Sequence, residues 1–399
     1  MISQYLRKLQ RKIAFAGEKV YYCNKYDHKE RRLIRMENNE GYYQPVTFPE
    51  DNRPNDTAQR DVKAVNIVFL IMVVLPQILV EFGIAKLMRG SYTALLVFSQ
   101  AVYIIPILVW LIFFKRSAEP CRFKKIRISN IFLCLVIYIC IIPLLGLLNT
   151  ISMLYSTNEI GGVIGGLSEQ IPYPLALLVV AIIPAFCEEL TYRGVFLSTY
   201  RKINPLLAVI MSGALFGILH GNLNQITYAV VLGIVFSLIV EATDSVFSSM
   251  IVHCMINAFS TTMVYLIPKL LNYLQELFEE ASTAGDSQTM DMVRQLIGSE
   301  NASLDSILSE SSNLTSRMVL STVMVYLLPA AVGCFLAFML LRFIARRNGR
   351  WEYLCGIFKK HEKKGKIFTW ALIAALAILV FIIVMNELTA RGIINISGG

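Results

Sequence analysis

Charged residues are scarce in this chain. Asp, Glu, Lys and Arg make up 16% of its 399 residues, whereas about 25% is usual for soluble proteins. Apolar residues amount to 55%, and they gather in runs of about 18–25, the length that crosses the roughly 30 Å hydrocarbon core of a bilayer. This balance excludes an ordinary cytosolic enzyme and a disordered chain. It predicts an all-α fold, that of a polytopic helical membrane protein.

Several sequence patterns are also missing. No CxxC pair occurs among the eight cysteines, and most of them fall within apolar runs, so we exclude a disulfide framework and expect reduced thiols. Residues 1–63 are hydrophilic and lack the apolar segment of a signal peptide. An HExxH zinc-protease motif is missing too, because the stretch from His361 to Lys364 has no second histidine.

The excess of positive charge has a topological explanation. The net charge is +9, but the basic residues stand between apolar runs and do not form one stripe along a surface. Such residues set the orientation of a membrane protein and do not make a phosphate-binding face. We therefore expect the lipid bilayer as a partner and no nucleic acid.

Nine transmembrane helices are predicted along the chain. They lie near 64–87, 91–114, 129–154, 172–198, 205–220, 224–241, 245–268, 318–345 and 367–388. We expect five regions: a cytosolic basic amphipathic helix and linker over 1–63, three N-terminal helices over 64–154, a core of four helices over 172–268, an extracytoplasmic acidic amphipathic loop over 269–317, and two C-terminal helices with a basic loop over 318–399.

The loops between these helices differ in charge. The 115–127 loop has six basic residues and one acid, the 346–366 loop has eight basic residues and two acids, and the 269–317 loop has eight acids and three basic residues. Cytoplasmic loops carry the excess of Lys and Arg. We therefore expect the N-terminus and the loops 115–127 and 346–366 inside, and the loop 269–317 outside. A bacterial plasma membrane fits this arrangement. Helical apolar stripes in the 269–317 loop would rest on the outer leaflet or form a lid over a substrate.

Three charged residues lie inside the fourth predicted span. At the centre of a span each charge costs at least about 2.5–3.5 kcal/mol, so such residues are functional candidates. Glu189 and Arg193 stand four residues apart and share a helix face, in the order that favours an ion pair. Glu188 points about 100° away from Glu189 and has no partner on its own helix. The three form either a packing cluster or a site in which Glu188 is kept for chemistry.

Two other spans carry polar residues at the same spacing. Phe216 and His220 are four residues apart in the fifth span, and His253 and Asn257 are four apart in the seventh. Each pair alone is explained by packing or by a hydrogen bond between helices. Counted from the cytoplasmic ends at about 1.5 Å per residue, Glu188 lies about 15 Å deep, His253 about 12 Å and His220 about 22 Å. We therefore expect one polar site within the bilayer.

These three motifs together resemble those of a known family. Glu-Glu-x-x-x-Arg from Glu188, Phe-x-x-x-His from Phe216 and His-x-x-x-Asn from His253 are similar, in order and spacing, to the signature motifs of the CPBP intramembrane proteases. This is the CAAX-protease and bacteriocin-processing group, also called the Abi family. The resemblance covers about 172–268. It implies a CPBP-type core bundle and an intramembrane endopeptidase whose substrate is a membrane protein or peptide.

The resemblance also implies roles for single residues. Glu188 would act as the general base on a water molecule that His220 orients. His253 and Asn257 would donate hydrogen bonds to the oxyanion of the tetrahedral intermediate. The supporting residues, which brace and pack the site, would be Glu189, Arg193 and Phe216.

Two alternatives for the chemistry use the same region. Glu188, His220 and His253 supply one oxygen and two nitrogens, which would hold a divalent metal such as Zn and leave a position for water. We favour a site without a tightly held metal, although the sequence leaves this choice open. Cys187 and Cys254 adjoin motif residues, but a neighbour in a helix points about 100° away, which disfavours a cysteine nucleophile.

Two other functions compete with proteolysis. A non-catalytic bacteriocin self-immunity or scaffolding protein of the same family would keep the motifs for structure. A secondary transporter would also place polar groups at mid-membrane, but the chain lacks two matching halves with broken helices. Cleavage that depends on Glu188 separates the protease from both.

Overall fold

The computed structural model describes residues 21–22, 34–35, 55–81, 91–113, 121–156, 170–297, 316–359 and 365–394. The chain forms two compact units, Met1–Gln44 and Pro45–Gly399. In the first unit, the described residues are two short antiparallel strands, β1 (Tyr21–Tyr22) and β2 (Ile34–Arg35). The basic amphipathic helix expected at the start of the chain lies outside the described residues.

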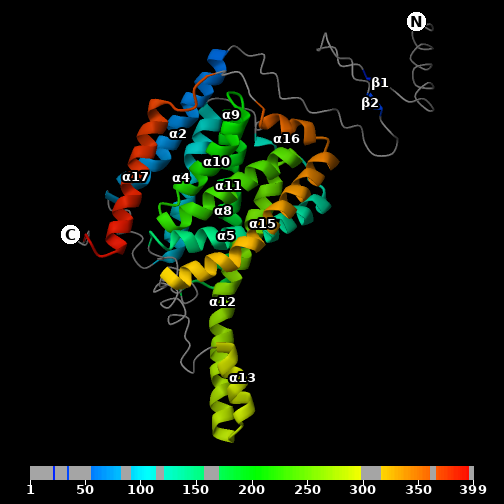
Figure 1. Cartoon of the computed structure of the whole chain (residues 1–399). Coiled ribbons are helices and arrows are strands. Elements are labelled where there is room, and N and C mark those ends of the chain that lie inside the picture. The colour runs from blue at the N-terminus through cyan, green and yellow to red at the C-terminus, as the bar shows by residue number, and fades with distance from the viewer. Residues whose placement is uncertain are drawn as a thin grey trace, which may run out of the picture. The chain divides into compact units, whose positions relative to one another are not determined.

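The second unit is a bundle of helices (Figure 1). They are α2 (Asn55–Glu81), α4 (Tyr92–Phe113), α5 (Ile128–Ser152), α7 (Tyr173–Ala176), η3 (Leu177–Ile182), α8 (Ile183–Glu189), η4 (Leu190–Leu197), α9 (Ser198–Tyr200), α10 (Pro205–Ile218), α11 (Leu223–Thr243), α12 (Val246–Ala284), α13 (Ser287–Ile297), α15 (Ser316–Arg347), α16 (Trp351–Ile357) and α17 (Trp370–Ala390). The predicted fold class, a polytopic helical membrane protein, is confirmed.

The number of membrane crossings is only partly tested. Among the described residues, 7 helices are long and apolar enough to span a bilayer, and α7 to α9 form one of them as a continuous helix, Tyr173–Tyr200. Two shorter apolar helices, Leu96–Trp110 and Pro205–Ile218, occupy the places of the other two expected spans. The total of nine stays a prediction.

The first long helix begins earlier than the sequence indicates. α2 starts at Asn55, within the stretch that we expected to be a linker. Its polar first turns are used in tertiary contacts: the buried carboxylate of Asp61 pairs with Lys202 Nζ at 2.9 Å, and Gln59 Nε2 donates to the Lys366 carbonyl at 2.9 Å. Because these polar groups find partners within the bundle, hydropathy alone places the start of the helix too late.

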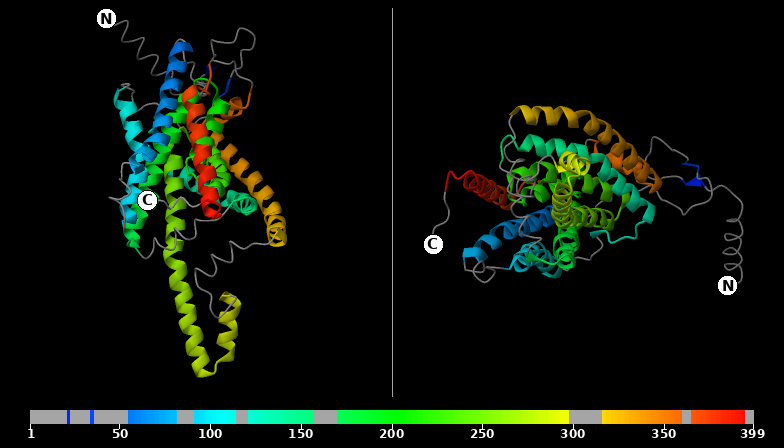
Figure 2. Two further views of the ribbon diagram at one scale, coloured as in Figure 1. Left: turned by 90° about the vertical axis from the view of Figure 1, so that its left-hand side faces the viewer. Right: turned by 90° about the horizontal axis from the view of Figure 1, so that it is seen from below.

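The seventh predicted span ends later than expected. α12 runs for 39 residues to Ala284, so the segment 269–284 continues the helix and is not a separate loop helix. At 1.5 Å per residue α12 is about 58 Å long, about 28 Å more than the hydrocarbon core requires. The chain then reverses at Gly285, whose φ is 72°, and α13 packs back along α12 (Figures 1 and 2).

Small residues bring two core helices close together. A Cβ on Gly213 of α10 would lie 2.7 Å from the backbone nitrogen of Ile234, and a Cβ on Gly217 would lie 2.7 Å from that of Val230. Gly213-x-x-x-Gly217 is the spacing that lets membrane helices approach at their backbones. It places α11, which carries none of the three motifs, directly against the helix that carries Phe216.

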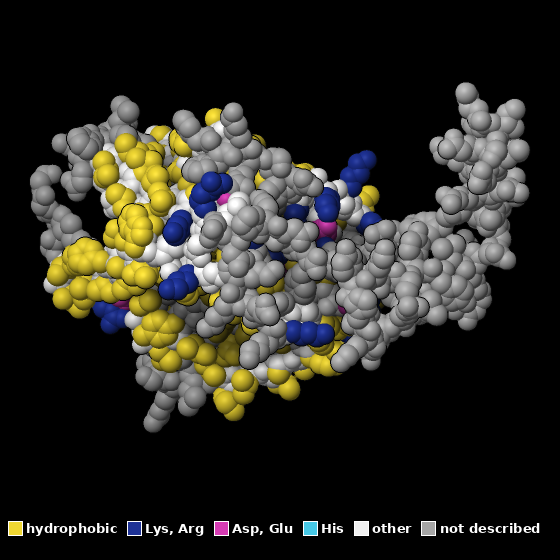
Figure 3. All heavy atoms as spheres, turned by 90° about the horizontal axis from the view of Figure 1, so that it is seen from above, with side chains coloured by type: hydrophobic (Ala, Val, Ile, Leu, Met, Phe, Trp, Pro, Cys, Tyr) yellow, Lys and Arg dark blue, Asp and Glu magenta, His cyan; other side chains and the backbone are white. Residues whose placement is uncertain are grey.

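One end of the bundle carries many basic side chains. Figure 3 looks onto the end where α9 and α16 lie, and Lys and Arg side chains are spread over it among apolar ones. The Lys124 side chain, for example, is 61% exposed there. By the charge of its loops this end is the one that we expect to face the cytoplasm.

Candidate active site

The helix that carries Glu188 and Glu189 has an irregular backbone. The two glutamates end the short segment α8, which lies between the π-helical segments η3 and η4. Local π-helical turns occur frequently at functional sites. Pro184, near the start of α8, has no N–H to donate to a carbonyl of the preceding turn.

Glu189 and Arg193 form the expected ion pair at the centre of the bundle. Arg193 Nη1 lies 2.8 Å from Glu189 Oε1, and both side chains are fully buried. Arg193 Nη2 also donates to the Gly233 carbonyl of α11 at 2.8 Å. A Cβ on Gly233 would lie 3.0 Å from that same nitrogen, so the close approach depends on glycine at this position.

Two phenyl rings complete the surroundings of Arg193. The guanidinium carbon lies 4.6 Å from the centre of the Phe216 ring and 5.3 Å from that of Phe236. Cations at this distance from an aromatic ring are stabilised by its quadrupole, more strongly when water is excluded. Arg193 is thus held by one carboxylate, one carbonyl and two rings.

His253 lies between the two glutamates. Its Nδ1 is 3.0 Å from Glu189 Oε1, and because an ionised carboxylate only accepts, Nδ1 carries the proton. Its Nε2 faces Glu188 Oε2 at 4.0 Å, which is too long for a direct hydrogen bond. The Phe236 ring packs on the imidazole, with centroids 5.4 Å apart and planes inclined by 33°. His253 therefore lies between Glu189, to which it is hydrogen-bonded, and Glu188, to which it is not.

His220 occupies the turn after α10, not the helix itself. α10 ends at Ile218, and His220 Nδ1 lies 2.8 Å from the Phe216 carbonyl oxygen. The Phe216 ring is edge-to-face with both imidazoles, with centroids 5.0 Å from His220 and 5.8 Å from His253. Gly221 follows with a φ of 69°, which lets the chain reverse into α11. Phe216 therefore separates the two histidines and packs against both.

Asn257 crosses from α12 to the helix of the glutamates. Its Nδ2 donates to the Val180 carbonyl at 3.2 Å. A carboxamide nitrogen carries two hydrogens, so a second N–H remains beside this bond. Asn257 lies one helical turn beyond His253, on the same face of α12.

The predicted convergence is present, although the catalytic roles stay predictions. Glu189 bonds Arg193 and His253, and Phe216 packs on both of these side chains. Glu188 lies 4.0 Å from His253, His220 joins through Phe216, and Asn257 joins through the backbone of η3. The sequence analysis missed the contributions of α11, namely the Gly233 carbonyl and the Phe236 ring. Neither group is charged. The one sequence feature that points to them is the Gly213-x-x-x-Gly217 spacing, which brings α10 close to α11.

Whether the site holds a metal stays open. Among the described residues, no group of three or more His, Cys, Asp or Glu side chains is arranged to hold a metal ion. This includes Glu188, His220 and His253, the three that we considered as zinc ligands. His253 Nδ1 donates to Glu189, so Nε2, which faces Glu188, is the ring nitrogen left for a ligand. We derive no catalytic step through a metal.

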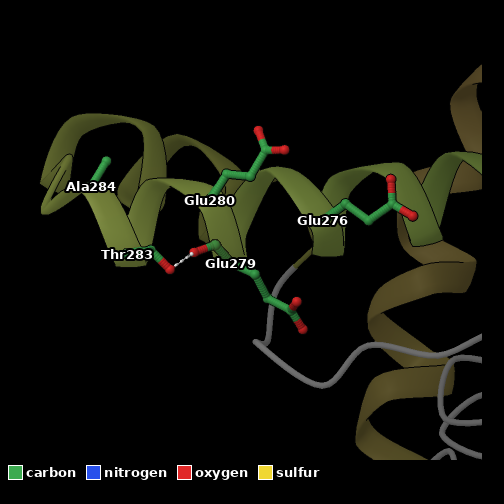
Figure 4. A pocket seen from close by; sticks show the side chains of 5 residues that line it. All are labelled: Glu276, Glu279, Glu280, Thr283 and Ala284. Carbon is green, nitrogen blue, oxygen red and sulfur yellow. Dashed lines mark hydrogen bonds between the residues drawn. The ribbon is translucent and has the colours of Figure 1, made fainter.

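A hollow in the described chain lies far along α12 and lacks these groups (Figure 4). It is lined by Glu276, Glu279, Glu280, Thr283 and Ala284. The Thr283 hydroxyl donates to the Glu279 carbonyl at 2.9 Å, and the three carboxylates point in different directions (Figure 4). No imidazole lines it, so it offers none of the acid–base chemistry expected of a hydrolase.

Similar proteins match the part of the chain that carries the three motifs. Residues 170–259, which include all three motifs, match the family described as type II CAAX prenyl endopeptidase Rce1-like. The chain is also 27% identical over 104 residues to the "Putative membrane peptidase YdiL" of Bacillus subtilis (strain 168), a stretch that covers 26% of this chain and 42% of that protein. The chain thus spans less than half the length of this relative. No solved structure matches the chain.

The class of protein follows from the fold, the motifs and these matches. A helical membrane bundle that brings two glutamates, two histidines and an asparagine together is typical of a membrane peptidase. Over residues 170–259, the segment that carries the three motifs, the chain is similar to CPBP-type membrane peptidases.

Proposed function

We propose that the protein is an intramembrane endopeptidase that hydrolyses a peptide bond of a membrane-associated protein or peptide. The observation that carries the proposal is that the two glutamates beside His253 differ in their partners. Glu189 Oε1 is bound by Arg193 Nη1 at 2.8 Å and by His253 Nδ1 at 3.0 Å. Within the described part of the chain, Glu188 has no ion-pair partner closer than His253 Nε2 at 4.0 Å. Its carboxylate is therefore free to act on a substrate or on water.

The gap between Glu188 and His253 suits a single water molecule. A water at ordinary hydrogen-bond distances of about 2.8 Å from both Glu188 Oε2 and His253 Nε2 would bridge the 4.0 Å between them. In the proposed step, Glu188 removes a proton from this water while the water oxygen attacks the peptide carbonyl carbon. The protonated carboxyl then gives that proton to the leaving amine nitrogen.

The other residues stabilise the charge that develops. Asn257 offers its second N–H to the oxyanion, and His253 does so through Nε2 when its ring is protonated. Glu189 accepts from His253 Nδ1 and so fixes the orientation of the ring. His220 is held by the Phe216 carbonyl and would orient the water or the substrate from the far side of the Phe216 ring.

We propose this chemistry without a bound metal. The support is that no group of three or more His, Cys, Asp or Glu side chains among the described residues is arranged to hold a metal ion. Stoichiometric zinc in the purified protein, lost together with activity in Glu188→Ala, would contradict it.

We propose further that the protein lies in a bacterial plasma membrane, with its N-terminus in the cytoplasm. The basic end of the bundle would then face the cytoplasm, and the α12–α13 hairpin would face the outside. The charge of the loops supports this orientation, and a fusion reporter at each end of the bundle would test it.

The experiment that tests the function is comparative proteomics of membrane fractions. Cells that produce the wild type, Glu188→Gln or the control Glu276→Gln, which changes a carboxylate of α12 far from the site, would be compared. We expect at least one membrane peptide to remain uncut in Glu188→Gln only. A phenotype such as peptide immunity that survives Glu188→Gln, with no peptide accumulating, would favour a non-catalytic role.

A further inference from the structure

A second cluster of charged side chains lies at the basic end of the bundle, and the proposed hydrolysis does not use it. It joins the segment before α5, the residue after α9, the C-terminal end of α11 and the residue before α16. Its members are Arg122, Lys124, Arg201, Glu241, Asp244 and Arg350. Four cations face two carboxylates, which leaves a formal excess of two positive charges.

The two carboxylates are shared among three guanidinium groups. Glu241, which is 1% exposed, lies 2.7 Å from Arg122 Nη2, 3.3 Å from Arg350 Nη2 and 3.7 Å from Arg201 Nη1. Asp244 lies 3.3 Å from Arg350 Nη1 and 3.8 Å from Arg122 Nε. Because each acid serves more than one cation, none of the arginines is fully neutralised.

Arg122 has the most unfavourable position of the three. Its side chain is 4% exposed, its φ is 53°, and its Nη1 has no hydrogen-bond partner among the described residues. A non-glycine residue in this backbone region costs about 1–3 kcal/mol, and a buried polar group without a partner costs about 1–3 kcal/mol more. The group nevertheless stays charged: burial lowers the pKa of Arg122, but Glu241, Tyr353 and Asp244 together raise it above its usual value.

We infer that this cluster binds the phosphate of an anionic lipid headgroup. A phosphate at the rim would offset the excess positive charge through Lys124 and Arg201, and guanidinium groups bind phosphate oxygens in a two-pronged geometry. The rim of the cluster is open to such a ligand, since the side chains of Lys124 and Arg201 are 61% and 17% exposed.

The position of the cluster favours a lipid as the source of the phosphate. It lies at the ends of membrane-spanning helices, where headgroups are found, and on the side that the loop charges predict to be cytoplasmic. The cytoplasmic leaflet carries the anionic lipids, and basic pockets between helices on that side bind their headgroups. Free phosphate has the same chemistry, so an experiment must separate the two sources.

Thermal unfolding of the full chain in lipid nanodiscs provides this test. Discs of phosphatidylcholine would be compared with discs that also contain phosphatidylglycerol, and with phosphatidylcholine discs in millimolar inorganic phosphate. A ligand that binds the folded state raises the unfolding temperature. We expect phosphatidylglycerol to raise it by several degrees for the wild type, and inorganic phosphate to raise it by much less.

Matched variants separate this site from general attraction to a charged surface. Lys124→Gln/Arg201→Gln removes two positive charges at the rim, and Lys359→Gln/Lys366→Gln removes two from exposed positions outside the cluster. We expect the first pair to lose at least half of the shift and the second to keep it. Equal shifts in both pairs would overturn the site. A shift with inorganic phosphate as large as that with phosphatidylglycerol would overturn the lipid assignment. Neither outcome depends on hydrolysis, because the readout is binding.

Discussion

The two charge clusters of this protein are built from the same groups but are unbalanced in opposite directions. In the site within the bilayer, Glu188 and Glu189 face a single guanidinium, that of Arg193. At the basic end, three guanidiniums and Lys124 face two carboxylates. Removing a charge from water is costly unless partners compensate it. The group without a full set of partners therefore indicates the chemistry of each cluster. In the bilayer site this group is a carboxylate, which can act as a base, and at the basic end it is a set of cations, which can bind an anion.

The balanced part of each cluster has a structural role. Arg193 joins three helices through Glu189, Gly233 and the rings of Phe216 and Phe236. Glu241 joins α11 to the segments that carry Arg122 and Arg350. Substitutions in these parts should change stability first, whereas substitution of a spare group should change function first.

The largest loss of stability is expected from Arg193→Met. It leaves the fully buried carboxylate of Glu189 without its cation, and breaking one partner of a buried pair costs about 3–5 kcal/mol. Reversible unfolding in mixed micelles would measure the change in unfolding free energy. Glu189→Gln/Arg193→Met should recover part of it, and a double variant no more stable than Arg193→Met would contradict the pairing.

A smaller loss is expected from Glu241→Gln at the basic end. The amide keeps the shape of the side chain but removes the charge that three arginines share, and hydrogen bonds to charged groups contribute about 1.5–3 kcal/mol. The same unfolding assay would measure it. Peptide cleavage per folded molecule should stay at the wild-type level, and loss of cleavage without loss of stability would show that the two clusters are not separate.

Gly233→Ala sharpens the comparison within the site. The new methyl group would lie 2.8 Å from the Gly213 Cα and 3.0 Å from Arg193 Nη2. Overpacking of this kind costs about 1–3 kcal/mol, and here it also moves the cation that holds Glu189. Ala229→Gly on the same helix is a control that adds no atom. Unfolding of Gly233→Ala at the wild-type midpoint would show that the glycine contact is not needed.

The smallest effect concerns the α12–α13 hairpin, away from both clusters. Hydrogen bonds from the Thr289 side chain and backbone lower the pKa of Asp286. A carboxylate whose pKa is lowered by folding stabilises the folded state when the pH is above the pKa of the unfolded chain. This stabilisation is lost as the pH falls through the lowered pKa of the folded state. The start of α13 should therefore loosen only in strong acid, below about pH 4. Hydrogen exchange across 286–297 would detect it, and Asp286→Ala should abolish the pH dependence.

The sequence predicted the site better than the limits of the helices. Charged and polar residues at four-residue spacing in apolar spans identified Glu188, His253 and their neighbours, because such residues are costly in a membrane. The start of α2 and the end of α12 were missed, since polar residues there are compatible with a helix that continues beyond the bilayer. Hydropathy cannot detect tertiary partners such as the one that Asp61 finds in Lys202.

The contacts between distant segments could not be predicted from the sequence. Gly233 and Phe236 contribute a backbone carbonyl and an apolar ring, which no residue pattern distinguishes from ordinary packing. The cluster around Glu241 joins segments more than a hundred residues apart. We had interpreted Arg122 and Arg350 only as topology signals, because the partner that each one finds depends on how the helices assemble.

The central claim is that the spare carboxylate of Glu188 activates water for peptide hydrolysis. Its most direct test is the cleavage rate of purified wild type and Glu188→Gln, reconstituted in liposomes with the membrane peptide that accumulates uncut in the variant. Loss of a general base lowers a rate by about 10²–10⁴-fold, and we predict a loss of this size with an unfolding midpoint close to that of the wild type. Cleavage by folded Glu188→Gln at the wild-type rate would contradict the claim.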